Sequence, residues 1–321
     1  MSTILHFSLR AIQFLSQQGP KAHKHTTWKH PILVCILHYT ITTAMLIPLH
    51  DYYIQSFHRQ FIRDQQLPDQ SRISRQIATF TFLYFVTLLS YRIIQNRQNH
   101  IIQKACIYEN TWLCNSTLYF GTIGLYTQRP ILVTAHLITV SIDQTLWYVD
   151  LAGFLIMKKF PIGVAKYLTW PETSFATRIT CTHHLWTIPL LMYGCHCDDL
   201  YTNMDKEEGG SMYLGGAAFG FSVLVMCLSV GLSRWMTPFY IAYDNAHSPK
   251  PRVKREENMT KYLNCNLSHE LWRDITFGFL RIQHDDPSTG VYLCRLLWRW
   301  QLLNGVILML LLRPMERWFF L

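Results

Sequence analysis

Charged side chains are scarce in this chain of 321 residues, where Asp, Glu, Lys and Arg together make up 15%. An ordinary soluble protein holds about 25% of these residues, and disordered chains combine high charge with few apolar groups. Acidic residues are missing altogether from positions 1–50. In their place the chain has 50% hydrophobic and 14% aromatic residues. This composition excludes a disordered or collagen-like protein and predicts an integral membrane protein.

Two further protein classes lack support in the sequence. The net charge of +9 comes largely from Lys and Arg that flank apolar segments, and no basic domain is present, so nucleic acid is not an expected partner. The 9 cysteines are odd in number and most lie in or beside apolar segments. That distribution argues against the disulfide framework of a small secreted protein.

A helix needs roughly 20 apolar residues to cross a bilayer core about 30 Å thick. Seven windows meet or approach this requirement, at 31–49, 77–95, 111–127, 130–157, 179–195, 212–236 and 291–312. The third and fifth windows are short and carry polar residues, which is typical of helices buried inside a bundle. The fourth is too long for one upright span and must tilt, break or continue along the interface. We expect an all-α polytopic bundle of about seven transmembrane helices, forming one domain over 31–321.

Lys and Arg residues are enriched in the cytosolic loops of membrane proteins. With a cytosolic N-terminus, the loops on the cytosolic side hold about twice as many Lys and Arg as the loops opposite. The sequence therefore predicts a cytosolic N-terminus and a cytosolic polar loop at 237–290. We expect the basic segment 1–30 to contain an interfacial helix, with a mitochondrial transit segment as the alternative.

One face of the fourth window carries titratable side chains at membrane depth. His136, Asp143 and Asp150 recur every seven residues, and Trp147 lies close to this stripe. Charged groups are costly inside a bilayer, so such a stripe marks either a functional site or a polar network that holds helices together. We expect His136 and Asp143 to line a polar cavity, although the stripe alone names no chemistry.

The predicted topology brings a thiol, an imidazole and a carboxylate to one depth below the cytosolic surface. Cys114 and Asn115 lie about one turn inside the third window, and His183 and His184 about one turn inside the fifth. Asp150 lies about two turns from the same side. An imidazole that removes a thiol proton creates a nucleophile, and an acid can orient that imidazole. We predict Cys114 as the nucleophile, one of the two histidines as the base and Asp150 as the orienting group.

A thiolate at this depth would face the ester bonds of phospholipids. Asn115 or Thr117 could donate a hydrogen bond to the oxyanion formed in the attack. The two histidines are adjacent, so we expect only one of them to point at the sulfur. We favour His184, because an ideal helix places it away from the face of Pro189, and retain His183 as the alternative.

Three segments resemble the transmembrane protein 164 family of membrane acyltransferases, which is distantly related to the androgen-induced lipid hydrolases. WLCNSTLYFGTIGLY (112–126) resembles the span that carries the family's cysteine, and TCTHHLWTIPLLMYG (180–194) a later span with its histidine. KYLNCN (261–266) is similar to an Asn-rich element that follows. The resemblance implies an endoplasmic reticulum enzyme that moves a fatty acyl chain from a phospholipid to a lysophospholipid through an acyl-cysteine. It places the nucleophile at Cys114 and the base at His183 or His184.

No cofactor is expected for this reaction, because the ester itself supplies the driving force. The mitochondrial membrane is the alternative location. Two other function classes stay open, and in both of them Cys114 is only a small buried apolar residue. A transporter or scaffold would use the stripe of His136, Asp143 and Asp150 as an ion path or structural network, but the sequence shows no inverted repeat. A metal-dependent lipid hydrolase would need three convergent His together with Asp and Ser. The sequence offers His136, His183, Asp143 and Ser141 for such a site, but no His-x-x-x-His pair to anchor it, so we expect no metal.

Overall fold

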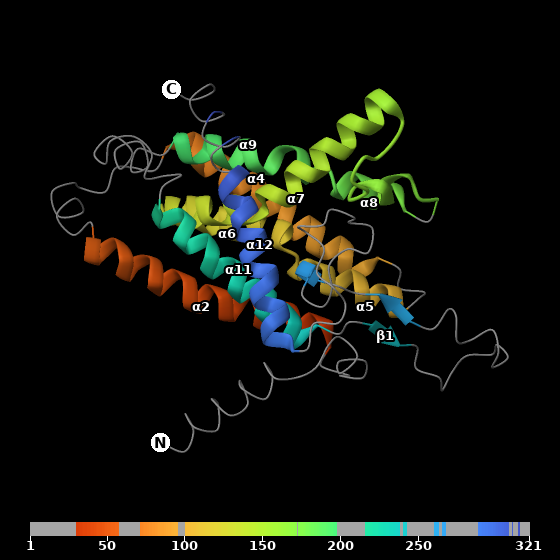
Figure 1. Cartoon of the computed structure of the whole chain (residues 1–321). Helices are drawn as coiled ribbons and strands as arrows, with labels where there is room; N and C mark the ends of the chain where they lie inside the picture. The colour runs from red at the N-terminus through yellow and green to blue at the C-terminus, as the bar shows by residue number, and fades with distance from the viewer. Residues whose placement is uncertain are drawn as a thin grey trace, which may run out of the picture. The chain divides into compact units, whose positions relative to one another are not determined.

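The computed structural model describes residues 30–57, 71–95, 100–171, 173–197, 216–237, 240–242, 260–262, 265–267 and 288–307, together with 310 and 314. These residues are mainly helical (Figure 1). The basic segment at 1–29 and most of the polar loop at 237–290 lie outside the described residues, so the expectations for them are not addressed by the structure.

Each of the seven apolar windows contains a helix. The α-helices are α2 (Pro31–Phe57), α4 (Arg72–Ile94), α5 (His100–Tyr108), α6 (Leu113–Tyr126), α7 (Pro130–Met157), α8 (Phe175–Thr180), α9 (His183–His196), α11 (Gly216–Met236) and α12 (Thr289–Ile307). Short 3-10 helices lie at η2 (Glu109–Thr111), η3 (Lys166–Thr169) and η6 (Cys265–Leu267). The mainly helical architecture is therefore confirmed. Helices α5 and α8 lie in segments that the sequence analysis treated as loops.

A small antiparallel ribbon is the exception to the all-α expectation. Strand β1 (Tyr240–Ala242) pairs with β2 (Thr260–Tyr262), with Ile241 opposite Lys261. Both strands are short and contain aromatic or β-branched residues, which favour extended backbone. They occupy the two ends of the stretch 240–262 within the polar loop.

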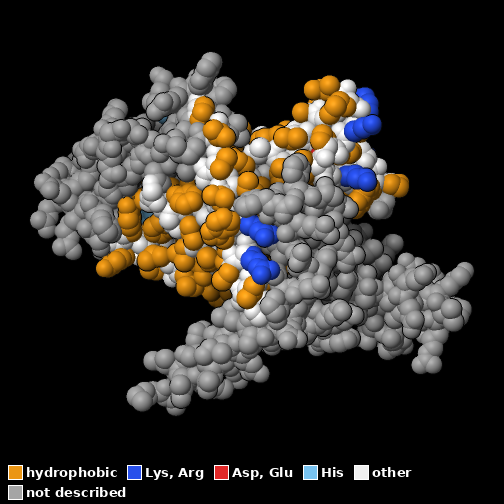
Figure 2. All heavy atoms as spheres, viewed as in Figure 1, with side chains coloured by type: hydrophobic (Ala, Val, Ile, Leu, Met, Phe, Trp, Pro, Cys, Tyr) orange, Lys and Arg blue, Asp and Glu red, His pale blue; other side chains and the backbone are white. Residues whose placement is uncertain are grey.

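Within the described ranges, three helices are long and apolar enough to cross a membrane, namely residues Pro31–Tyr53 of α2, α4 and α11. Large apolar side chains on these helices are exposed, including Ile36 on α2 and Leu83 on α4. Figure 2 shows hydrophobic side chains over much of the described surface in this view, with Lys and Arg at few places. Lipid is the environment that covers such a surface at low cost. These helices indicate a membrane protein.

The other helices fit the requirement for a span less well. The described part of α12 is not apolar enough to be a candidate membrane span, because it contains Arg295 and Arg299. Helices α6 and α9 have 14 residues each, which corresponds to a length of about 21 Å at 1.5 Å per residue. Helix α7 is a single unbroken helix of 28 residues that ends at Met157, and the next residue, Lys158, has a left-handed backbone with φ 56°.

The described residues cluster into two compact units. The first contains those within Met1–Tyr39, Leu89–Trp112 and Leu228–Arg299, and the second those within Thr40–Leu88, Leu113–Cys227 and Trp300–Leu321. The boundaries fall inside α2, α4, α11 and α12, so these helices contribute residues to both units.

Helices α6, α7 and α9 form the core of the second unit and pack against one another. Nearly every residue of α6 is buried, and so is the first half of α7. Gly121 permits a close approach of α6 to α9, because a Cβ atom there would lie 2.6 Å from the side chain of Leu191. This packing brings the residues at the start of α9 close to those at the start of α6.

The first unit has its own apolar core. Val34, Ala105, Tyr108, Met236 and Cys265 are buried together. This core includes a residue of the KYLNCN segment, namely Cys265. The final residue of that segment, Asn266, has a left-handed backbone with φ 57° and donates hydrogen bonds from its side chain to the hydroxyl of Ser233 and the carbonyl of Thr111.

Candidate functional site: a thiol beside two imidazoles

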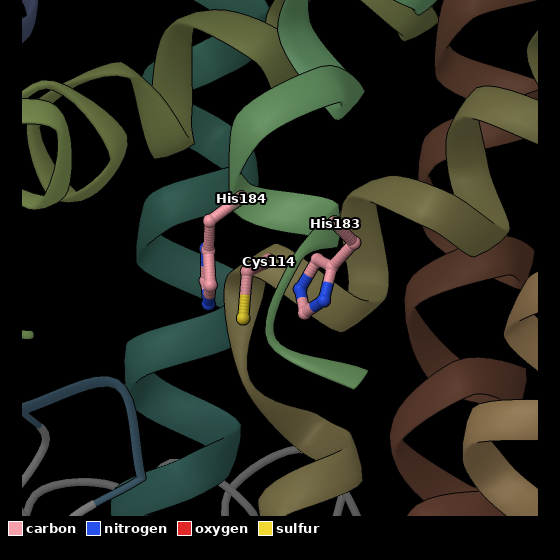
Figure 3. Close-up of side chains that lie close together, drawn as sticks. All are labelled: Cys114, His183 and His184. Carbon is pink, nitrogen blue, oxygen red and sulfur yellow. The ribbon is translucent and has the colours of Figure 1, made fainter. Parts of the chain in front are cut away.

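Cys114, His183 and His184 converge in the second unit. Cys114 lies in the first turn of α6, and the two histidines are the first residues of α9. The Cys114 Sγ atom and one ring nitrogen of each histidine all lie within 4.8 Å of one another (Figure 3). Cys114 and His183 are buried, and His184 is half-buried. The structure thus brings together the thiol and the imidazoles that the sequence analysis selected from two separate windows.

Local structure explains why these three side chains occupy helix starts. Trp112 has an extended backbone that ends the preceding 3-10 helix, so α6 begins at Leu113 and Cys114 is its second residue. Helix α8 ends at Thr180, and a turn at Cys181 and Thr182 separates it from α9. The N-terminus of a helix carries partial positive charge, which favours an anionic group such as a thiolate.

A main-chain carbonyl fixes the orientation of the His183 ring. Its Nδ1 atom lies 2.6 Å from the carbonyl oxygen of Thr180, so Nδ1 carries the proton and donates it. The same carbonyl accepts a hydrogen bond of 2.8 Å from the hydroxyl of Tyr84. In the neutral ring the lone pair is therefore on Nε2. This arrangement suits a general base and favours His183 over His184, the histidine preferred from the sequence.

His184 is placed by two neighbouring rings. Its ring centroid lies 4.2 Å from that of His183 and 5.6 Å from that of Trp147 on α7. The expectation that only one of the adjacent histidines points at the sulfur was wrong. Successive residues diverge by about 100° around a helix axis, but here the two rings lie against each other and a ring nitrogen of each is within 4.8 Å of the sulfur (Figure 3).

Tyr167, in the connection between α7 and α8, also belongs to this environment. Burial, followed by the neighbouring Cys181 thiol, raises the pKa of the Tyr167 hydroxyl well above its usual value, and Cys114 adds a smaller effect in the same direction. The hydroxyl stays protonated and is a potential hydrogen-bond donor beside the site. Sequence analysis missed Tyr167, because no periodicity or motif distinguishes it from other residues of the connection.

Asp150 has a role different from the predicted one. Its Oδ1 atom accepts hydrogen bonds from the backbone N–H groups of Ile162 at 2.7 Å and Gly163 at 3.0 Å. Its Oδ2 atom accepts one from the N–H of Ala165 at 2.8 Å. The carboxylate thus holds the turn that precedes Tyr167, and it makes no hydrogen bond to either histidine. Gly163 has φ +98°, which a residue with a side chain rarely adopts.

His136, which was expected to line a polar cavity, is part of the helix packing. Its Nδ1 atom lies 2.9 Å from the carbonyl oxygen of Leu132, and its ring stacks on Phe120 with centroids 4.4 Å apart. Thr117, a candidate oxyanion donor, gives its hydroxyl hydrogen to the carbonyl of Leu113 at 2.8 Å. Neither side chain belongs to the thiol–imidazole cluster.

The remaining predicted site residues differ in their distance from the cluster. Asn115 follows Cys114 directly and is buried. Trp147 is buried beside His184. Asp143 is half-buried on α7 and lies outside the cluster. Of the stripe on α7 and its neighbours, Trp147 is thus the residue that adjoins the candidate site.

The cluster is the one group of three or more His, Cys, Asp or Glu residues with converging ligand atoms in the part of the chain that the structure describes. Its three atoms are two imidazole nitrogens and one sulfur, which are donors for zinc as well as partners in nucleophilic catalysis. The site could therefore hold a metal ion or form an activated thiol.

Comparison with known proteins does not distinguish these uses. No family model, no curated protein and no solved structure matches this chain.

Proposed function

We propose that the protein is an integral membrane acyltransferase that moves a fatty acyl chain between a phospholipid and a lysophospholipid through an acylated Cys114. The observation that carries this proposal is the convergence of the Cys114 sulfur with ring nitrogens of His183 and His184 from a separate helix. The three long apolar helices support a membrane location. The resemblance to the transmembrane protein 164 family supports the choice of reaction.

The reaction begins with transfer of the Cys114 thiol proton to Nε2 of His183, whose ring is oriented by the Thr180 carbonyl. The thiolate attacks the carbonyl carbon of a phospholipid ester and forms a tetrahedral intermediate. When the carbon–oxygen ester bond breaks, His183 returns the proton to the leaving oxygen, which yields a lysophospholipid and an acyl thioester on Cys114.

The second half-reaction reverses these roles. The hydroxyl of another lysophospholipid attacks the thioester carbonyl while His183 removes its proton. The carbon–sulfur bond breaks, and His183 returns the proton to the Cys114 sulfur. All atoms and charges balance without a cofactor. The hydroxyl of Tyr167 is a candidate donor to the oxyanion in both steps, because its raised pKa keeps it protonated and Cys114 is among the neighbours that raise it.

The membrane arrangement that fits this chemistry has about seven spans, a cytosolic N-terminus and a location in the endoplasmic reticulum. In that arrangement the N-terminal ends of α6 and α9 lie below the cytosolic leaflet, at the depth of the lipid ester bonds. Helices α6 and α9 are shorter than the bilayer core, which suits helices enclosed in a bundle.

The test is direct detection of the acyl-enzyme. Full-length protein in phospholipid vesicles that carry a labelled acyl chain is quenched in denaturant, and the label on the protein is measured before and after neutral hydroxylamine. We expect a hydroxylamine-sensitive label that maps to Cys114 and is absent from Cys114→Ser. The matched control is Cys265→Ser, a change to a buried cysteine of the first unit that should keep the label. A labelled Cys114→Ser protein would disprove the cysteine mechanism.

The transporter alternative predicts a different result. A transporter that uses the stripe on α7 would lose function with Asp143→Asn and form no acyl thioester. The observations on that stripe do not favour this alternative, because His136 is engaged with Leu132 and Phe120 and Asp150 with the backbone at Ile162–Ala165.

A further inference from the structure

The cluster contains one more imidazole than an acyl transfer requires. His183 has the orientation expected of the base, yet a ring nitrogen of His184 also lies within 4.8 Å of the sulfur. The two histidine rings are tilted by 32° to one another with centroids 4.2 Å apart, and the sulfur lies close to both of them (Figure 3). A catalytic pair of Cys114 and His183 gives the ring of His184 no role, whereas a metal ion would bind all three side chains.

We propose that Cys114, His183 and His184 bind one zinc ion. In tetrahedral zinc sites the metal lies about 2.3 Å from sulfur and about 2.0–2.1 Å from nitrogen, which sets the ligand atoms about 3.3–3.6 Å apart. The three donor atoms here lie within 4.8 Å of one another. A rotation of the side chains that moves each atom by about 1 Å would reach this geometry. Thiolate and imidazole together are a ligand set that zinc prefers over magnesium or calcium.

The environment of His183 is a second, independent observation. Metal-binding histidines usually donate their other ring N–H group to a carbonyl or carboxylate, which fixes the ring and strengthens the ligand. The Nδ1 atom of His183 makes this contact with the Thr180 carbonyl, which the Tyr84 hydroxyl also contacts. Nε2 is consequently the ligand atom of His183.

The proposed site has three protein ligands. Among the residues that the structure describes, no fourth His, Cys, Asp or Glu joins the group. Three ligands and one open position are typical of zinc sites that bind water or substrate, whereas purely structural zinc sites have four. The fourth ligand here is therefore a water molecule or an oxygen atom of a lipid.

Zinc binding would also control the proposed reaction, and this consequence rests on the proposed function. When zinc binds, the Cys114 thiol loses its proton to solvent and its sulfur is coordinated to the metal. Nε2 of His183 is coordinated as well, so neither group can perform the acyl transfer. The zinc-bound protein is then an inactive form, and removal of the metal restores the nucleophile.

The experiment measures metal binding on the full-length protein in detergent, without reference to activity. Protein stripped by a chelator is titrated with Zn²⁺ and, separately, with Co²⁺, whose bond to a thiolate gives a charge-transfer absorption band. We expect about one ion per chain and a thiolate band. We expect Cys114→Ser to abolish the band and His184→Ala to weaken Zn²⁺ binding by about 100-fold or more.

The chain supplies a matched control in the Cys195-His196-Cys197 tract at the end of α9, which has the same donor types. Cys195→Ser and Cys197→Ser should bind both metals as the unaltered protein does. Loss of the cobalt band in these variants, or its persistence in Cys114→Ser, would overturn the proposed site. Circular dichroism of each variant verifies that the helices are intact.

A second arm separates this proposal from the acyltransferase proposal. Acylation of Cys114 is measured in the metal-free protein and again after addition of Zn²⁺. Acylation that zinc suppresses and a chelator restores supports both proposals. Zinc binding without acylation in the metal-free protein supports the metal site and contradicts the acyltransferase. Acylation that excess Zn²⁺ leaves unchanged overturns the metal site alone.

Discussion

Two buried thiols in this protein have opposite surroundings. Cys114 in the second unit has ring nitrogens of His183 and His184 near its sulfur. Cys265 in the first unit is fully buried among apolar side chains, and its sulfur lies 3.5 Å from the carbonyl oxygen of Tyr108. Both residues are buried, yet we expect them to react differently.

The difference shows that neighbours decide the chemistry of a buried cysteine. Burial raises the pKa of the Cys265 thiol to about 12, because a thiolate loses its hydration there and gains no cation. An imidazole next to a thiol accepts its proton and balances the resulting charge. Each prediction below changes one side of this comparison.

The largest effect is expected from loss of the base. His183→Ala should reduce acyl transfer by about 10²- to 10⁴-fold, the usual contribution of a general base, when rates are measured with a labelled phospholipid in vesicles. His184→Ala is the matched change to the adjacent residue and should reduce the rate by about tenfold or less, since the Thr180 carbonyl orients the ring of His183. Equal losses in the two variants would contradict the assignment of His183 as the base.

The next largest effect concerns thiol reactivity. At about pH 8 a thiol with a pKa near 12 is ionised in about one molecule in ten thousand, so a maleimide should leave Cys265 unmodified in the native protein. Cys114 should react much faster, and added Zn²⁺ should protect it. Mass spectrometry of the labelled peptides gives both rates, and labelling in denaturant shows that each peptide can be detected. Modification of Cys265 at the rate of Cys114 would remove the distinction between them.

A smaller effect is expected from a change to Asp150, which holds the turn that precedes Tyr167. Asp150→Ala would leave the N–H groups of Ile162, Gly163 and Ala165 without their acceptor, which we expect to cost about 2–4 kcal/mol of unfolding free energy. Thermal unfolding in detergent measures this loss. Asp143→Ala is the control on the same helix, because Asp143 makes no hydrogen bond to another residue that the structure describes. If the two variants unfold alike, Asp150 does not hold this turn.

The sequence was sufficient to predict where most helices lie. Long apolar runs identify helices by composition alone, so each of the seven windows contains one. Helices α5 and α8 were missed, since α5 is short and α8 has only 6 residues, FATRIT. Their stability depends on packing that a single sequence does not show. The ribbon of β1 and β2 was missed for a similar reason, because its strands have 3 residues each.

For the candidate site, depth along the helices was predictable and side-chain direction was not. Position in a window places Cys114 and the two histidines near the starts of their helices, and the structure brings these residues together. Which way each ring points depends on the turn that starts α9. The partners of Asp150 are backbone groups 12 to 15 residues further along the chain, and nothing in the sequence marks them. The same holds for Tyr167.

The smallest effect tests whether Cys265 has any role beyond packing. Cys265→Ala removes one buried sulfur from a core that includes Val34 and Met236, and we expect it to lower the unfolding free energy by about 1 kcal/mol. Acylation should be unchanged, because Cys265 belongs to the first unit and the thiol–imidazole cluster to the second. Cys294→Ala, at an exposed position, is the control and should change stability by less than about 0.5 kcal/mol. A loss of acylation in Cys265→Ala with little loss of stability would show that the first unit contributes to the chemistry, and the contrast between the two thiols would then be one of degree.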